Sequence, residues 1–152
     1  MSRSTAPLSH VVIGTWELSS REDRTPNGER VVEPSLGHDP VALLIYDRSG
    51  HFAAQFVRRG RGSAPEEDGV PAASSNNSRA RNGYDAYFGT YTVDDVNGTV
   101  TQTLLGALSP ENVGMVLTRA MSVIGDRLTI RLKTTAASGD PVIRTLQWRR
   151  VG

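Results

Sequence analysis

Two arginines on predicted strands are the residues of this 152-residue chain whose surroundings first suggest chemistry. Arg119 lies two residues before Met121, and Arg144 lies two residues before Leu146. The alternation of a β-strand therefore places each arginine on an apolar face. A guanidinium in such a place is costly unless it pairs with an anion or reaches water. Either both arginines extend into water at a rim, or they bind an anionic group such as a carboxylate, enolate or phenolate.

The same arginines could serve a cofactor-independent enzyme. Such a site needs a dry cavity, a cation that stabilises an enolate, and a side chain that moves a proton. The residues that we assign to these catalytic roles are Arg119, Tyr91, Arg144, Tyr46 and His51.

Other familiar kinds of site lack their residues. The chain has no cysteine, and His10, His38 and His51 share no metal-ligand spacing. No Gly-x-Ser-x-Gly motif is present, and the glycines at 60 and 62 precede no predicted helix that could hold a phosphate. The adjacent acids at 66–68 and 94–95 fall in predicted loops or turns, where we expect them to be solvated. We therefore expect no metal site and no cofactor.

Charge and composition exclude further classes of protein. The 17 basic and 16 acidic residues nearly cancel, whereas nucleic-acid-binding proteins show a dominant basic face. No apolar run approaches the roughly 18–20 residues that cross a bilayer, and the N-terminus lacks the apolar stretch of a secretory signal. We expect a cytoplasmic protein with a disordered N-terminus over residues 1–10 and a single domain over residues 11–152, without nucleic-acid or membrane partners.

The elements that must position these side chains are β-strands, because the dominant hydrophobic period is two. Residues 127–134 and 142–150 alternate between apolar and polar side chains, and residues 41–46 are apolar throughout, which indicates a strand that is buried on both sides or shielded by a neighbouring segment. Turn signals such as Asn97-Gly98 separate the strands. We predict about eight or nine strands, over residues 11–20, 29–33, 41–47, 51–58, 89–95, 99–108, 115–124, 127–134 and 142–150. Many short strands with tight turns indicate an antiparallel sandwich or barrel.

Two segments interrupt the strand pattern. Residues 59–79 are rich in Gly, Pro, Ser, Asn and charge, which predicts either a lid or an unstructured hairpin tip. Residues 78–87 are compatible with one or two helical turns, with Ser78 as the N-cap and Tyr84, Tyr87 and Phe88 on one face.

Gly14-Thr15-Trp16 opens a series of five motifs that continues at residues 37–46, 87–94, 125–129 and 145–150. In this order the motifs resemble those of the lipocalin-like domain family of small bacterial and fungal proteins. The resemblance covers residues 11–150. It implies an all-β fold, an antiparallel up-and-down barrel of about eight to nine strands with a long lid loop and a short helix.

The family resemblance also implies roles for individual residues. Trp16 would pack against Arg149 or Arg150 at the closed end of the barrel and would serve structure rather than chemistry. The sequence departs from the family at residues 101–105, which read Thr-Gln-Thr-Leu-Leu where relatives often carry a His-His-x-Glu type of stretch. If those residues act chemically in relatives, this protein lacks that chemistry or performs it without them.

Three functions are open to such a barrel, as a monomer or a homodimer. The first is binding of a small apolar or aromatic molecule, with or without an anionic group, because an eight-stranded barrel is just wide enough for one small ligand. The second is a cofactor-independent isomerase, cyclase or lyase acting on a polyketide-like or terpenoid-like intermediate, which the resemblance suggests. The third is a protein-interaction scaffold with a filled core. The predicted ligand-binding residues are Trp16, Leu18, Gln55, Phe56, Tyr87, Gln102, Met121, Val123, Ile130, Leu146 and Trp148.

Overall fold

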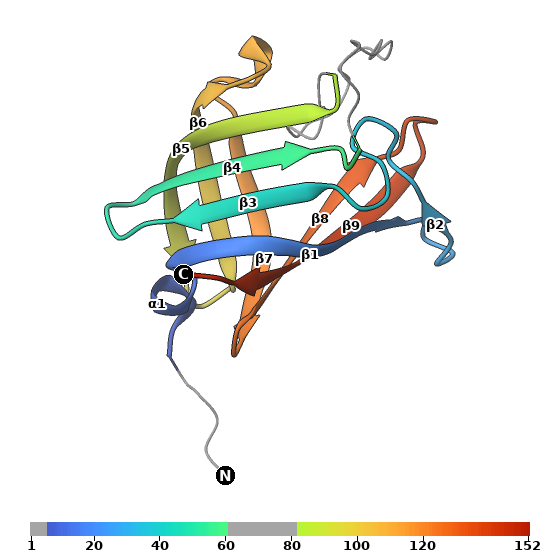
Figure 1. Ribbon diagram of the computed structural model, residues 1–152. Coiled ribbons are helices and arrows are strands. Elements are labelled where there is room, and N and C mark those ends of the chain that lie inside the picture. The colour runs from blue at the N-terminus through green and yellow to red at the C-terminus, as the bar shows by residue number, and fades with distance from the viewer. Residues whose placement is uncertain (1–5, 61–81) are drawn as a thin grey trace.

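Nine antiparallel strands make up most of the described chain, which comprises residues 6–60 and 82–152 of a computed structural model (Figure 1). The strands are β1 (Gly14–Arg24), β2 (Arg30–Val31), β3 (Val41–Tyr46), β4 (His51–Val57), β5 (Tyr84–Asp94), β6 (Thr99–Ala107), β7 (Val116–Ile124), β8 (Arg127–Thr135) and β9 (Pro141–Arg150). Strand β1 pairs with β3, and each strand from β3 to β8 pairs with the next one along the chain. Strand β9 then pairs with β1. This closes an eight-stranded barrel, with β2 as an extra strand on β1. The all-β, up-and-down barrel predicted from the sequence is confirmed.

The barrel core follows from the alternation of inward apolar residues along each strand. Trp16, Trp148, Tyr46, Leu104 and Leu128 are the largest of its fully buried side chains. The apolar strand β3 obeys the same rule, because its odd-numbered residues face outward and are 37–42% exposed. The expectation that residues 41–46 are buried on both sides is therefore wrong.

Strand β1 changes its inward face halfway along its length. Its register with β9 shifts between Leu18 and Ser20, which marks a β-bulge. Trp16 is buried before the bulge, whereas Arg21 and Asp23 are buried after it. The extra residue thus reverses the alternation and brings two charged side chains into the barrel, at positions beyond the predicted strand end at residue 20.

The helical content differs from the sequence prediction. Residues 84–87 belong to β5 and pair with β4, so the predicted helical turns over residues 78–87 are wrong in their described part. The lid prediction over residues 59–79 falls almost entirely outside the described residues. At the N-terminus, where we expected disorder over residues 1–10, α1 (Leu8–Val11) forms one helical turn. The Ser9 amide and hydroxyl both donate to the Asp95 carboxylate at 2.8 Å.

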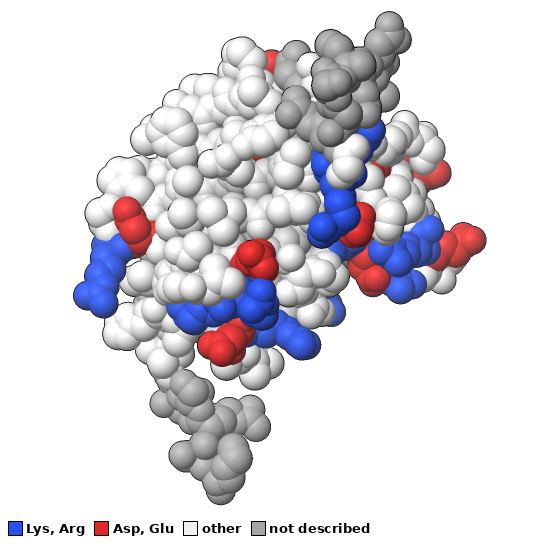
Figure 2. All heavy atoms as spheres, viewed as in Figure 1, with Lys and Arg blue, Asp and Glu red and all other residues white. Residues whose placement is uncertain are grey.

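Charged side chains are distributed unevenly over the outside of the barrel. Figure 2 shows Lys, Arg, Asp and Glu gathered below β3 and towards β2, while the surface over β3 and β4 is almost free of charge. The outward residues of β3 are Val41, Leu43 and Ile45, and those of β4 include no Lys, Arg, Asp or Glu.

Candidate functional site

A cavity of about 60 Å³ lies inside the barrel, towards the end farther from α1. Since a water occupies about 30 Å³ in the liquid, this volume has room for about two water molecules. Its lining comes from β1, β3–β9 and the segment between β2 and β3, and consists of Arg21, Leu36, Leu44, Phe56, Asp85, Tyr87, Gln102, Arg119, Ile130, Leu132, Arg144, Leu146 and Trp148.

Three aromatic rings form a large part of the apolar wall. The Phe56 ring stacks on Tyr87 with centroids 6.4 Å apart and meets the edge of Trp148 at 5.8 Å. Such aromatic contacts stabilise the packing beyond the area that they bury. All three residues were predicted from the sequence as cavity residues, together with Ile130 and Leu146, which also line it.

Arg144 faces the cavity but is already paired within the protein. Its Nε and Nη2 donate to the two carboxylate oxygens of Asp23 at 2.8 and 2.9 Å. Both side chains are at most 4% exposed, so this is a buried, two-point ion pair. The sequence suggested a ligand anion or water as the partner of Arg144, and the structure corrects this to Asp23. The bulge in β1 supplies that carboxylate.

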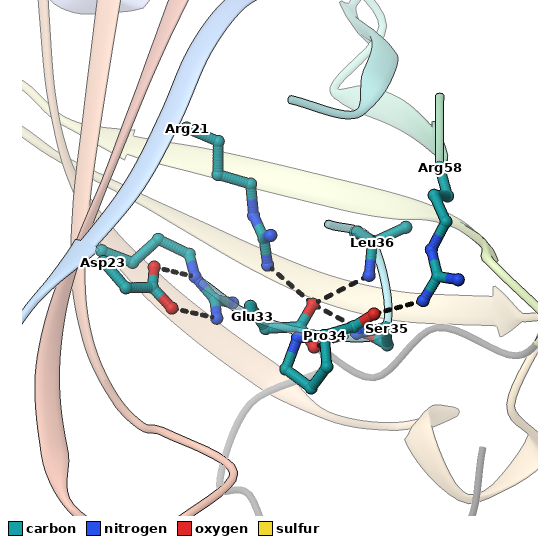
Figure 3. Close-up of polar contacts among 8 residues, drawn as sticks. Arg21, Asp23, Glu33, Pro34, Ser35, Leu36 and Arg58 are labelled. Atoms are coloured by element: carbon teal, nitrogen blue, oxygen red, sulfur yellow. Dashed lines mark hydrogen bonds and ion pairs between the residues drawn. The ribbon is translucent and has the colours of Figure 1, made fainter. Parts of the chain in front are cut away.

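Residues 32–37, here called the mouth segment, cross the cavity end of the barrel (Figure 3). The Glu33 carboxylate accepts hydrogen bonds from Arg21 Nη2 at 3.3 Å, the Ser35 amide at 2.6 Å, the Ser35 hydroxyl at 2.7 Å and the Leu36 amide at 3.3 Å. Arg58 donates to the Pro34 carbonyl. These contacts hold Leu36, which is only 3% exposed, against the cavity.

The charge of Arg21 is balanced by this mouth segment. Burial, reinforced by the nearby charge of Arg144, lowers the pKa of Arg21 to about 10, while Glu33 and Asp23 oppose that shift. Arg21 therefore remains cationic at neutral pH and is paired with Glu33.

Arg119 is the cavity cation without such a partner. Among the described residues, no hydrogen bond or ion pair joins its guanidinium to another side chain or carbonyl, and it lines the cavity. Burial lowers the pKa of Arg119, and the proximity of Arg144 acts in the same direction, while Tyr87 and Tyr46 oppose it. Arginine nevertheless stays charged in proteins. Arg119 is thus a partly buried positive charge that faces a cavity with both apolar and polar walls.

Tyr46 lies behind the cavity wall and is tied to it through Gln102. The Tyr46 hydroxyl accepts a hydrogen bond from Gln102 Nε2 at 2.6 Å and donates to Met121 Sδ at 3.9 Å. Complete burial raises the pKa of Tyr46 far above its usual range, so its hydroxyl stays neutral. Tyr46 therefore cannot supply a phenolate base.

Two more polar atoms are buried without a partner among the described residues, and both belong to cavity-lining side chains. They are Asp85 Oδ1 and Trp148 Nε1, in residues that are 3% and 1% exposed. Burial raises the pKa of Asp85 to about 7, although the Ala86 amide and Arg21 lower it. Asp85 therefore exchanges its proton near neutral pH. The sequence prediction missed this residue because it placed a helix there.

The remaining predicted site residues lie elsewhere. Gln55 and His51 are exposed on the outer face of β4, so the prediction that they face the cavity is wrong. The Tyr91 hydroxyl donates to the Asp47 carbonyl at 2.6 Å rather than to the cavity. Four predicted ligand-binding residues pack in or against the core without lining the cavity: Trp16, Leu18, Met121 and Val123.

Trp16 belongs to the opposite, closed end of the barrel. Its Nε1 donates to the Val12 carbonyl at 2.9 Å, and the Arg150 guanidinium lies 4.3 Å from the centre of its ring. Arg150 also donates to the Val11 and Ile13 carbonyls at 2.5 and 2.8 Å. Of the two arginines proposed as the partner of Trp16, the structure selects Arg150.

The comparisons with known proteins agree with this architecture. The family model described as a lipocalin-like domain matches residues 13–151, which is nearly the whole chain. No curated protein matches the sequence. Within residues 6–60 and 82–152, no helix is long and apolar enough to span a membrane.

Proposed function

We propose, for a chain that belongs to the lipocalin-like domain family, that the barrel cavity binds a small apolar or aromatic molecule carrying an anionic group. The observation that carries this proposal is Arg119. It is the cavity-lining arginine whose guanidinium has no hydrogen-bond or ion-pair partner among the described residues, whereas Arg21 pairs with Glu33 and Arg144 pairs with Asp23.

The charges of the cavity support an anionic ligand. Each of the two ion pairs cancels its own charge, which leaves Arg119 and the titrating carboxyl of Asp85. No ion pair joins these two residues. An unpaired cation that is largely removed from water is costly, and a ligand carboxylate, enolate or phenolate offsets that cost. The surrounding leucines, Ile130 and aromatic rings suit an apolar body attached to the anion.

The size of the cavity limits the ligand. A cavity of about 150 Å³ has accommodated benzene in another protein, whereas this one measures about 60 Å³. A short-chain carboxylate fits with little change. A ring needs more space, and Leu36 is placed to provide it, because it belongs to the mouth segment rather than to a barrel strand.

Titration calorimetry with benzoate, and with the uncharged benzyl alcohol as its comparison, tests the role of Arg119. We expect Arg119→Met to weaken benzoate binding about tenfold or more, since a hydrogen bond to a charged group contributes roughly 1.5–3 kcal/mol. Binding of benzyl alcohol should hardly change. Arg131→Met, on an exposed position of β8, is the matched control. Equal benzoate affinity in the protein with and without Arg119 would overturn the proposal.

A second candidate function is catalysis without a cofactor, as an isomerase, cyclase or lyase of a polyketide-like or terpenoid-like intermediate. Asp85 favours it, because a carboxyl with a pKa of about 7 can take and return a proton beside a cation that stabilises an enolate. The proton-transfer role then belongs to Asp85 rather than to Tyr46, Tyr91 or His51. Exchange of the methylene hydrogens of phenylpyruvate with deuterated water, followed by NMR, should be accelerated by the protein and lost in Asp85→Asn.

The third hypothesis, an interaction scaffold, required a core with no cavity larger than one or two waters. The cavity of about 60 Å³ holds about two waters, so its size alone does not separate the two hypotheses. We give binding of a small molecule precedence because Arg119, Asp85 and Trp148 line this cavity with polar groups that have no partner among the described residues.

A further inference from the structure

We infer that the ligand carries a hydroxyl group, set apart from its anionic group, which Asp85 and Trp148 hold by hydrogen bonds. The ligand class is then a hydroxylated apolar or aromatic acid. This inference rests on the proposed function and adds a second recognition point to the anion site at Arg119.

The two residues reach the cavity from opposite sides of the barrel, because three strands separate β5 from β9 in either direction. Asp85 on β5 pairs in register with Phe56 on β4, and the Phe56 ring packs edge-on against Trp148 of β9 at 5.8 Å. Both Asp85 and Trp148 line the cavity, and each is at least 97% buried. Phe56 is thus the strand partner of Asp85 and contacts the Trp148 ring, and all three residues line the cavity together with Leu36 of the mouth segment.

The chemistry of the two atoms selects a hydroxyl. An indole N–H only donates, and above pH 7 the Asp85 carboxylate is mainly ionised and only accepts. A hydroxyl satisfies both, because its oxygen accepts from Trp148 Nε1 while its proton is donated to Asp85 Oδ1. A halogen, a methyl group or a second carboxylate leaves at least one of these buried atoms unsatisfied, and each unsatisfied atom costs roughly 1–3 kcal/mol.

The other polar groups of the cavity cannot fill this need. Gln102 donates to Tyr46, and Asp23 binds Arg144 through both of its oxygens. Arg21 and Glu33 are the charged groups that influence Asp85, and they pair with each other. No hydrogen bond joins any of them to Asp85 Oδ1 within the described residues.

The anion and the hydroxyl occupy separate points of the cavity. Arg119 lies on β7 and Asp85 lies on β5, with β6 between the two strands. On its other side, Arg119 is two strands away from Trp148 on β9, with β8 between them. A ligand that reaches both residues therefore needs an apolar body between its two polar groups, which describes a hydroxylated acid such as a hydroxybenzoate.

The experiment compares the affinity of benzoate with those of 3-hydroxybenzoate and 4-hydroxybenzoate at pH 8, where Asp85 is mainly ionised and a phenol stays largely neutral. We expect the protein to prefer at least one hydroxylated probe over benzoate by about tenfold. Asp85→Ala and Trp148→Phe should each reduce this preference to less than threefold while benzoate still binds. Trp16→Phe is the matched control, because it removes an indole N–H at the other end of the barrel.

The outcomes separate this inference from the proposed function. If both variants keep the full hydroxyl preference, or if the protein shows none, the hydroxyl site is overturned while Arg119-dependent benzoate binding stands. If neither benzoate nor the hydroxybenzoates bind, the proposed function and this inference fail together. Urea denaturation of each variant identifies unfolded protein, and Asp85→Leu replaces Asp85→Ala in that event, because its side chain has a similar size but no atom that accepts a hydrogen bond.

Discussion

The two ends of the barrel each contain a buried tryptophan, and the two tryptophans differ in whether the indole N–H has a hydrogen-bond partner. At the closed end, Trp16 donates its N–H to Val12 and is covered by Arg150, whose guanidinium also binds backbone carbonyls. At the cavity end, the N–H of Trp148 has no partner among the described residues, and Oδ1 of the Asp85 carboxyl shares this condition. The first arrangement stabilises the fold, whereas the second leaves binding capacity for a ligand.

The same contrast separates the charged groups within the cavity. Arg144 and Asp23 pair with each other, so, like the Trp16 and Arg150 contacts at the closed end, they stabilise the fold and leave no polar group for a ligand. Arg119 belongs with Trp148 and Asp85, because it lines the cavity without an ion pair or hydrogen bond to the described protein. Position in the cavity alone therefore does not identify a binding residue; the presence or absence of a protein partner does.

Removing one side chain of the buried ion pair should have the largest effect on the free energy of unfolding. Asp23→Ala leaves Arg144 charged and unpaired, so we expect the free energy of unfolding to fall by about 3–5 kcal/mol. The control is Glu17→Ala at the closed end, whose pair with Arg149 is exposed and is expected to contribute less than about 1 kcal/mol. Urea denaturation measures both changes. Similar losses in the two variants would contradict the distinction between the buried and the exposed pair.

The next largest effect is the change of stability with pH that is caused by Asp85. The native pKa of Asp85, about 7, lies above its usual value of 3.8, so between these pH values the folded state binds its proton more tightly than the unfolded chain. Stability is therefore lost as the pH rises from 4 to 7 and stays level above it. From pH 5 to pH 8 the loss due to Asp85 should be about 2–3 kcal/mol.

Asp85→Asn isolates this contribution, since it removes the titrating group and keeps its size. The pH-dependent loss, measured by urea denaturation at each pH, should be smaller in Asp85→Asn than in the unaltered protein by the amount due to Asp85. Parallel pH profiles would show that Asp85 titrates normally and would remove it from the group of unpaired cavity residues.

Replacing each tryptophan by phenylalanine compares the two ends directly. Both substitutions remove the same atoms, but Trp16→Phe also leaves the Val12 carbonyl without its hydrogen bond. Trp148→Phe removes an N–H that has no described partner. We expect Trp16→Phe to be the more destabilising by about 1–2 kcal/mol in thermal or urea unfolding. The reverse order would indicate that Trp148 is satisfied within the protein.

The smallest effect is expected from Leu36→Ala. Shortening this side chain enlarges the cavity at the mouth segment, so benzoate should bind about threefold more tightly, a gain of less than about 1 kcal/mol. Leu43→Ala, on the outer face of β3, should leave the affinity unchanged. Weaker benzoate binding in Leu36→Ala would show that Leu36 contacts the ligand instead of occupying its space.

Much of the fold could be predicted because period-two alternation and Gly-containing turns are local signals. Eight of the nine predicted strands agree with the observed strands to within a few residues at each end. These eight are β1–β4 and β6–β9. Strand β5 begins five residues earlier than the predicted start at residue 89, since its first half gains stability from pairing with β4. The sequence around Tyr84 and Tyr87 carries no alternation strong enough to indicate this.

The candidate site was predictable only where the alternation is regular. Phe56, Trp148 and Arg119 follow directly from their strand faces. Asp23 and Arg21 do not, because a β-bulge leaves no pattern in the sequence of β1. Asp85 was hidden by the helical interpretation of its segment, and Leu36 lies in a connection without periodicity. The carboxylates that pair with the cavity arginines, and so decide whether an arginine can bind a ligand, thus come from the least regular parts of the chain.

The offset in β1 also has a genetic consequence. Ser19 is the residue that lies between the two registers of this strand with β9. Loss of its single codon would remove the bulge but leave Ser20 opposite Gln147, so Arg21 and Asp23 would still face inwards on a regular strand. Arg144 would then keep its counter-ion, whereas the insertion of one further residue between Ser20 and Asp23 would turn Asp23 outwards and leave Arg144 unpaired.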